Sequence, residues 1–462
     1  MHRKKSAQLV EGPIGKTLIR LTLPMIFGIL GMVAFNLVDT FYVGQLGTAP
    51  LAAISFTFPV ILMLNSLSMG LGVGASAVIS RAIGEGDPYK VKRLTTDSLV
   101  LALLVVVAFV ALGLLTINPL FQALGARGEI LALTRQYMLI WYLGMPFVVI
   151  PMVGNNAIRA TGDTKTPSAI MMTAVVVNMV MDPLLIFGLG PFPRMELAGA
   201  ALATVLARAT TLGVSFWVLY HREKMITFSP PALSEVLASW RQILYIGLPT
   251  AATNMIIPVA AGIVTRLLAS FGPETVAGYG VASRIDMFAL TVLMALGSVL
   301  GPFVGQNLGA GKFDRLRRGV SLSQRFALVW GGLMFLLLAV LARPVAGLFN
   351  DNPLVIDTIV LYLHIVPIGY GMQGMLMLSN TTLNVLNKPF YASGLIITQM
   401  FVLYVPLAYL ASTMFGPAGI FSAAVTANLL AGLAAFLVLR RLLPAGAVRT
   451  PSQPYRVPAG GK

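Results

Sequence analysis

The chain has no cysteine, only three histidines and few charged residues. Without cysteine it forms no disulfide and has no thiol nucleophile, although this absence does not identify a compartment. His2, His221 and His364 lie far apart in the sequence, so the reactive constellation that an enzyme needs is missing. Charged residues make up 10% of the chain and hydrophobic residues 57%, which leaves too little polar surface for a water-soluble protein of 462 residues. We therefore expect a polytopic membrane protein that is not an enzyme.

Long apolar stretches are what the sequence has in abundance. About twenty apolar residues suffice to cross ~30 Å of hydrocarbon. The first stretch follows Arg3-Lys4-Lys5, but it is long, lacks an Ala-x-Ala exit and has a counterpart later in the chain. We therefore interpret it as a membrane span and not as a signal peptide. We expect twelve spans, beginning near Leu18, Leu51, Leu94, Ile130, Pro167, Glu196, Gln242, Thr275, Gly319, Leu354, Tyr391 and Pro417.

The second half of the chain repeats the first. Leu23, Pro24, Gly47 and Gly84 recur 225 positions later as Leu248, Pro249, Gly272 and Gly309. Such an offset indicates an internal duplication, and two homologous halves in an apolar chain are typical of transporters. We predict an all-α integral membrane fold, with two six-helix lobes related by a pseudo-two-fold axis along the membrane normal.

The domain boundaries follow from the longest internal connection, which contains Pro230 and Pro231. We predict a first lobe over 1–220, a cytoplasmic linker over 221–241 and a second lobe over 242–443. The segment 444–462 is rich in proline and glycine, and we expect it to be a disordered tail.

Basic residues alternate with the spans. The N-terminus, every second loop and the C-terminus hold 25 of the 32 lysines and arginines. By the positive-inside rule both termini are cytoplasmic, and the expected location is the cell (inner) membrane. The net charge of +16 is therefore mostly topogenic and does not indicate a nucleic-acid partner.

Two acids lie inside predicted spans of the first lobe. Asp39 is about 31 Å along the first span and Asp182 about 22 Å along the fifth, at 1.5 Å per residue. Both depths fall in the outer half of the membrane. Asn36 shares a helical face with Asp39, and Asn178 shares one with Asp182. Since the duplicated positions are Val264 and Val405, the acidic pair belongs to one lobe.

An ionised carboxylate in a bilayer normally faces a wet cavity or binds a cation. Two nearby carboxylates can share a proton, whereas amide and hydroxyl oxygens around them can coordinate Na⁺. We therefore predict a coupling site for H⁺ or Na⁺, with no other cofactor. A structural alternative is that an acid simply pairs with Arg208 on the sixth span. The predicted site residues are Asp39, Asp182, Asn178, Thr204 and Asn36, of which all but Asn36 are candidate Na⁺ ligands.

The remaining first-lobe predictions concern substrate and movement. Tyr137, Asn155 and Met172 are predicted to line the substrate cavity, although polar residues of this kind also serve as interhelical hydrogen-bonding groups. Pro24 removes a backbone hydrogen bond from the first span and is predicted to act as a hinge. A structural role is the alternative, because its copy Pro249 occupies the same place in a span without an acid.

The polar residues of the second lobe give weaker evidence for a functional site. Asp286 and Arg284 lie on one span but do not face each other at this spacing, so each needs another partner. His364 can titrate, or it can serve as a hydrogen-bonding core residue.

Three motifs carry a family resemblance. They are Leu23-Pro24 with the stretch from Asn36 to Gly44, the loop from Arg159 to Pro167, and the stretch from Asn178 to Pro183. The sequence resembles the multidrug and toxic compound extrusion (MATE) family, and within it the DinF-like branch. The resemblance implies twelve helices in two lobes and export of bulky, often cationic organic compounds in exchange for H⁺ or Na⁺. It also implies that Asp39 and Asp182 are paired coupling acids, with Asn178 and Thr204 as cation ligands.

The chain departs from the NorM-like branch, which has acids on the seventh and tenth helices. Asn254 and Gln373 stand in these regions instead, so the first lobe is the expected coupling centre. The expected partners are small-molecule drugs or organic cations and the lipid bilayer, with a monomeric transporter. A lipid-linked glycan flippase of the same superfamily is the alternative function. A channel is less consistent with repeats that have lost the acids from one copy.

Overall fold

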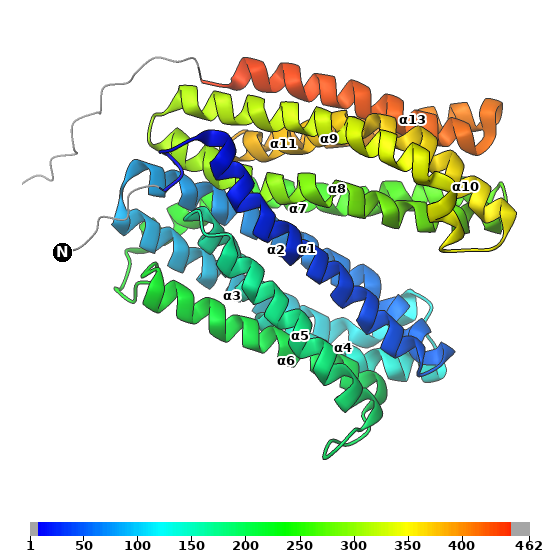
Figure 1. Ribbon diagram of the computed structural model, residues 1–462. Coiled ribbons are helices and arrows are strands. Elements are labelled where there is room, and N and C mark those ends of the chain that lie inside the picture. The colour runs from blue at the N-terminus through cyan, green and yellow to red at the C-terminus, as the bar shows by residue number, and fades with distance from the viewer. Residues whose placement is uncertain (1–7, 445–462) are drawn as a thin grey trace, which may run out of the picture.

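The structure is a computed structural model that describes residues 8–444. Within this range the chain forms helices and short connections, with no strand. The first six long helices lie together in Figure 1, in blue to green. They are α1 (Ile14–Gly44), α2 (Thr48–Glu85), α3 (Pro88–Ala123), α4 (Gly128–Ala160), α5 (Lys165–Phe187) and α6 (Glu196–Trp217), after which comes the π-helical turn η1 (Val218–Arg222).

The second group of helices follows the linker. It comprises α7 (Leu233–Ala269), α8 (Pro273–Gly309), α9 (Phe313–Gly347), α10 (Pro353–Ile365), the 3₁₀ turn η2 (Val366–Gly369), α11 (Tyr370–Val385), α12 (Pro389–Ile397), the π-helical turn η3 (Thr398–Tyr404) and α13 (Val405–Leu442). Helices α10 and α11 continue each other through η2 and make one apolar span, Pro353–Val385.

The last helical stretch makes two crossings. The described residues contain eleven helices long and apolar enough to span a membrane, and the last of these, Pro389–Leu442, has 54 residues. At 1.5 Å per residue it would be more than twice as long as the ~30 Å hydrocarbon core is thick. Gly416 interrupts it with φ 58° and ψ −142°, values open to glycine but not to a residue with a side chain. A Cβ on Gly419 would lie 2.1 Å from the carbonyl oxygen of Ala411, so the two arms fold against each other and the total is twelve.

The lobes pack against each other mainly through α2, α7 and α8. A Cβ on Gly84 would lie 2.1 Å from the carbonyl oxygen of Gln306, and a Cβ on Gly309 would lie 2.1 Å from that of Arg81. Since 84 and 309, and also 81 and 306, differ by 225, these two contacts are copies of each other. They confirm the pseudo-two-fold relation between the lobes.

These contacts lie at one end of the bundle, which we call the basic end. It is where α1, α3, α7 and α9 begin and where α2 and α8 finish. In Figure 1 the two groups of helices converge at this end, on the left, and separate toward the right. Close backbone packing thus joins the lobes at the basic end.

The segment before each lobe docks on the other lobe. Ahead of α1, the Leu9 amide donates to Gln306 Oε1 at 3.1 Å, and Arg315 donates to the carbonyls of Leu9, Glu11 and Gly12 at 3.2, 2.7 and 2.6 Å. Leu9 is buried. The segment directly ahead of α1 is therefore bound across the lobe interface at the basic end.

The linker ahead of α7 and the first turns of α7 make the corresponding contacts on the first lobe. The Arg93 side chain donates to the Ser229 carbonyl at 3.3 Å, the Tyr89 hydroxyl donates to Glu235 at 3.1 Å, and Trp240 Nε1 donates to the Asp97 carbonyl at 3.0 Å. Arg93 also forms a buried ion pair with the Asp97 carboxylate. The end of the linker and the start of α7 are thus both bound to α3.

The turn between α4 and α5 contains a local charge cluster. Asp163 accepts from the Thr166 amide at 3.1 Å and from its hydroxyl at 2.5 Å, which satisfies an otherwise free N–H at the start of α5. Arg222 donates to the Asp163 carboxylate. Burial alone would raise the pKa of Asp163, but the hydrogen bonds from Thr166 and the Arg222 charge outweigh it and hold this pKa below its usual range. The turn is therefore tied to the end of the sixth span.

Candidate functional site

A pair of carboxylates lies among the helices of the first lobe. Asn178 and Asp182 are one turn apart on α5, and the Asn178 amide donates to Asp182 Oδ1 at 3.0 Å. Both side chains are fully buried. The other oxygens of the two groups, Asn178 Oδ1 and Asp182 Oδ2, have no hydrogen-bond partner. The α5 face therefore presents two free oxygen acceptors.

Helices α1 and α4 complete this cluster. Asp39 on α1 interacts electrostatically with Asp182, and the buried Tyr137 on α4 interacts with both carboxylates. Asp39 Oδ1 is itself buried without a hydrogen-bond partner. The structure thus brings Asp39, Asp182, Asn178 and Tyr137 together. We call these four residues the first-lobe acidic site.

The chemistry of the site suits a small cation. Three unpartnered oxygens converge from two helices, and two negative charges in a low-dielectric interior repel each other unless a proton or cation neutralises one of them. The described residues contain no group of three or more His, Asp or Glu able to hold a metal ion. A Na⁺ bound here would depend on the two carboxylates and neutral oxygens.

The other predicted site residues are less closely connected. Thr204 lies on α6, which packs against α5, but within residues 8–444 no hydrogen bond joins its hydroxyl to either carboxylate. Asn36 lies on α1 and its side chain is outside the described residues. Asn155 on α4 has a buried, unpartnered Oδ1. Met172 is 39% exposed and its sulfur lies 2.5 Å from where a Cβ of Gly31 would be, which places it against α1.

The proline of α1 does not interrupt its helix. Helix α1 is continuous from Ile14 to Gly44 through Pro24. Because proline has no N–H, the Arg20 carbonyl one turn earlier lacks its helical partner. In this conformation the first span is unbroken, and the hinge stays a prediction.

Arg208 is not paired with a carboxylate in the described part of the chain. Its guanidinium carbon instead lies 5.2 Å from the centre of the Phe35 ring on α1. Its Nε is buried and has no hydrogen-bond partner. The structural alternative in which Arg208 neutralises one of the acids therefore does not hold in this conformation.

The second lobe has a neutral polar chain and one buried acid. Gln399 donates to Asn428 at 2.6 Å, and Asn428 donates to Gln373 at 3.4 Å. Asn254 Nδ2 is buried and unpartnered. Of the two positions where the NorM-like branch has acids, position 373 thus holds an amide that is hydrogen-bonded to another amide, whereas the Asn254 amide nitrogen has no partner in the described residues.

Asp286 on α8 is the group whose surroundings sequence reasoning missed. It interacts electrostatically with Tyr279, Tyr362, Tyr370 and Tyr404. The rings of Tyr279 and Tyr362 are 6.0 Å apart. Asp286 Oδ1 and the Tyr370 hydroxyl attract each other but do not reach hydrogen-bond geometry, and both are buried without a partner. The only signal in the sequence was the acid itself, because these tyrosines come from several helices.

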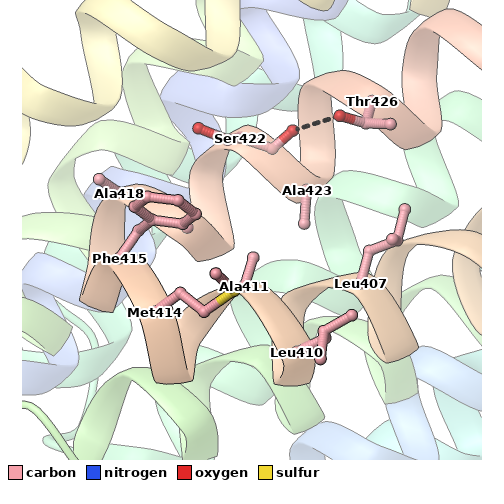
Figure 2. A pocket seen from close by; sticks show the side chains of 10 residues that line it. Leu407, Leu410, Ala411, Met414, Phe415, Ala418, Ser422, Ala423 and Thr426 are labelled. Atoms are coloured by element: carbon pink, nitrogen blue, oxygen red, sulfur yellow. Dashed lines mark hydrogen bonds between the residues drawn. The ribbon is translucent and has the colours of Figure 1, made fainter.

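One apolar groove lies away from these polar groups. It has a volume of about 370 Å³ and is lined only by α13 residues on the two sides of Gly416, including Leu407, Met414 and Phe415 (Figure 2). The one hydrogen bond drawn there runs from the Thr426 hydroxyl to the Ser422 carbonyl, at 3.0 Å. No residue of the first-lobe acidic site lines this groove.

Two repeated six-helix lobes with unpaired acids inside one of them define a membrane transporter. The MatE family model matches residues 24–184 and 249–410, one segment in each lobe. The chain therefore belongs to the MATE family of multi-pass membrane transporters and is not an enzyme.

Individual relatives agree in fold but differ in substrate. The chain is 38% identical to the FAD transporter of Shewanella oneidensis, over 94% of this chain and 96% of that one. It is 26% identical to the multidrug export protein MepA of Staphylococcus aureus, over 93% and 94% of the two chains. The crystal structure of the Vibrio cholerae MATE transporter VcmN in the bent form has a TM-score of 0.88 and 31% identity, and the match covers 93% of this chain and 97% of that one.

Proposed function

We propose that the protein exports bulky organic molecules across the inner membrane in exchange for H⁺ or Na⁺. The observation that carries this proposal is the first-lobe acidic site, a pair of interacting carboxylates with unpartnered oxygens inside a MATE fold. Such groups are costly to keep in a membrane, so they normally bind or release a cation. The DinF-like branch stays part of this proposal.

The arrangement of the lobes supports an alternating-access cycle. If the basic end is cytoplasmic, as the positive-inside rule predicts, the lobes are sealed together on the cytoplasmic side by Gly84, Gly309 and their partners. They diverge toward the outside (Figure 1). Asp39, near the far end of α1, then lies toward the outer side. This conformation is the one in which an external cation would reach the site.

Coupling would follow from charge neutralisation. With the site empty, Asp39 and Asp182 repel each other, so one proton or Na⁺ bound between them lowers the electrostatic free energy of this conformation. Binding would draw α1 and α5 together, and a bend at Pro24 is one way for α1 to respond. Asn178 would hold the Asp182 carboxylate in place through its 3.0 Å hydrogen bond.

The relatives suggest two substrate classes. Multidrug export by MepA favours varied organic compounds, including cations. The higher identity to an FAD transporter favours a second candidate, a flavin dinucleotide with two negative phosphates. We propose that a bulky organic framework is the common requirement.

Reconstituted protein tests the proposal. Purified transporter in liposomes would be given a fluorescent organic cation or FAD, and an H⁺ or Na⁺ gradient would be imposed separately. We expect one gradient to drive uphill extrusion, and Asp39→Asn and Asp182→Asn to abolish it. Asp286→Asn makes the same substitution in the second lobe and is the matched control, which should keep gradient-driven extrusion.

Two results would overturn the proposal. One is normal uphill extrusion by well-folded Asp39→Asn protein. The other is no extrusion of either compound under either gradient by folded wild-type protein, which would favour the flippase alternative and call for a lipid-translocation assay.

A further inference from the structure

Arg208 holds a charged group inside the first lobe without an opposite charge. It lies twelve residues after the start of α6, about 18 Å along the helix. Its Nε is buried and unpartnered. Its two Nη atoms make no hydrogen bond in the described residues and, unlike Nε, are not among the fully buried atoms. The guanidinium therefore has an enclosed Nε and two Nη atoms that make no hydrogen bond among the described residues and are not fully enclosed.

Phe35 supports the guanidinium from α1. The Arg208 Cζ lies 5.2 Å from the ring centre, within the range of a cation–π contact, and the ring is 4% exposed. This contact holds the guanidinium carbon over the ring but uses none of its N–H donors. Its hydrogen-bonding capacity is left for another molecule.

The acids nearby do not use these donors either. Asp39 lies one helical turn beyond Phe35 on α1, about 6 Å along the axis. No ion pair joins Asp39 or Asp182 to Arg208 among the described residues. Thr204, one turn before Arg208 on α6, shares its helical face and carries a hydroxyl with no hydrogen bond to either carboxylate.

We propose that Arg208, resting on Phe35, is an anion-binding subsite of the first lobe that receives a phosphate or carboxylate group of an organic substrate. A guanidinium whose two Nη atoms make no hydrogen bond to the described residues matches the two oxygens of such a group in a bidentate pair. Burial of the stem lowers the local dielectric and strengthens this interaction. The inference deepens the proposed export function, on which it rests, by naming a chemical class of substrate that cation recognition alone would exclude.

A comparison of two flavins tests this inference, because riboflavin has no phosphate and FAD has two. Binding of each to the purified protein would be followed by flavin fluorescence anisotropy, with inorganic pyrophosphate as a competitor. We expect Arg208→Gln to lower the affinity for FAD by roughly tenfold or more, the loss typical of one charge-assisted hydrogen-bonded pair. Riboflavin affinity should change far less, so the ratio of the two affinities falls.

Two further variants separate charge from geometry and from general electrostatics. Arg208→Lys keeps the positive charge but cannot donate two parallel hydrogen bonds as a guanidinium does. Its affinity for FAD should therefore lie between those of Arg208→Gln and the wild type. Arg284→Gln removes an exposed arginine of α8 and should leave the ratio of the affinities unchanged. The melting temperature of each variant establishes that it is folded.

Three results would overturn the inference. One is an equal loss of FAD and riboflavin binding in Arg208→Gln, which would show a packing role. Another is an unchanged ratio in that variant. The third is failure of FAD and pyrophosphate to bind wild-type protein that still exports an organic cation, an outcome that rejects the anion subsite while leaving the proposed export function intact.

Discussion

The two lobes share a scaffold but hold their polar groups differently. In the first lobe Asp39 and Asp182 face each other from α1 and α5, whereas the duplicated positions in the second lobe are valines. Val264 is 1% exposed and packs in the hydrophobic core. The second lobe instead has Asp286, from a different helix, among tyrosines. Duplication thus preserved glycines, prolines and packing, while the charged groups are specific to each lobe.

This difference between the lobes shows which positions are constrained by packing in both copies of the repeat. The glycine contacts of Gly84 and Gly309 appear twice because each lobe must approach the other equally closely. A carboxylate need not occur in both lobes. Because an ionised carboxylate is costly in a membrane, it is expected only where it binds a proton or a cation. The helix packing is therefore common to both lobes, whereas the first-lobe acidic site is specific to the first.

Exchanging the acid and the valine should give the largest effects. Val264→Asp places a carboxyl in a packed apolar site without a partner and should lower the free energy of unfolding by about 2.5 to 3.5 kcal/mol. The reciprocal Asp39→Val removes an unpartnered carboxylate and should keep or raise stability while abolishing gradient-driven export. Chemical denaturation in detergent measures the first quantity and liposome flux the second.

Val264→Thr is the control for the first change, because it alters shape little and introduces no charge. If Val264→Asp protein were as stable as the wild type, the second lobe would hold a ready acid site at this position. The two lobes would then differ at this position in the residue present, and not in their ability to accommodate an acid.

The next largest effect is expected from removing the hydrogen bonds that hold the segment ahead of α1 at the basic end. Arg315 makes three hydrogen bonds to the segment ahead of α1, whereas Lys90, its duplicated position, pairs with Glu85 of its own lobe at 2.7 Å. Arg315→Ala should therefore weaken closure of the basic end by about 1.5 to 3 kcal/mol, the range for hydrogen bonds from charged groups. Lys90→Ala should have little effect.

Spin labels on the α2–α3 and α8–α9 turns would report this closure as a distance distribution. The chain has no native cysteine, so two introduced cysteines would be labelled without background. We expect a population with a longer distance in Arg315→Ala. Identical distributions in Arg315→Ala and wild type would show that the glycine contacts alone hold this end closed.

The fold and the acidic pair could be predicted from sequence because each depends on local spacing. Helical rise places Asp39 and Asp182 in the same, outer half of the membrane, and the repeat of 225 residues indicates two lobes. The described residues end at 444, so the predicted tail lies almost wholly outside them. The domain boundaries stay predictions.

The surroundings of Arg208 and Asp286 could not be predicted in this way. Phe35 meets Arg208 from a helix 173 residues earlier in the chain, and the tyrosines around Asp286 come from α8, α10, α11 and η3. Spacing within one helix shows which residues share a face, but not what the next helix presents to that face. An arginine and an acid in the same lobe therefore suggested an ion pair that the packing does not make.

The smallest expected effect concerns the α4–α5 turn, where the lobes also differ. Lys165 recurs as Lys388, but Asp163 has no carboxylate counterpart in the turn that contains Asn387 and Lys388. In the folded protein the pKa of Asp163 lies below its usual range, so the ionised form stabilises the fold. That contribution is complete above the unfolded-state pKa of about 3.9 and is lost as the pH falls through the folded-state value.

Asp163→Asn should therefore lower stability at pH 7 and make no difference at a pH below both values. Arg222 is 42% exposed, so solvent screens the pair and the effect at pH 7 should be at most about 1 kcal/mol. The difference in melting temperature between variant and wild type, measured from pH 7 downward, isolates this carboxylate from the acids inside the membrane. A difference that grew on acidification would contradict this prediction, because it would mean that the pKa of Asp163 is higher in the folded than in the unfolded protein.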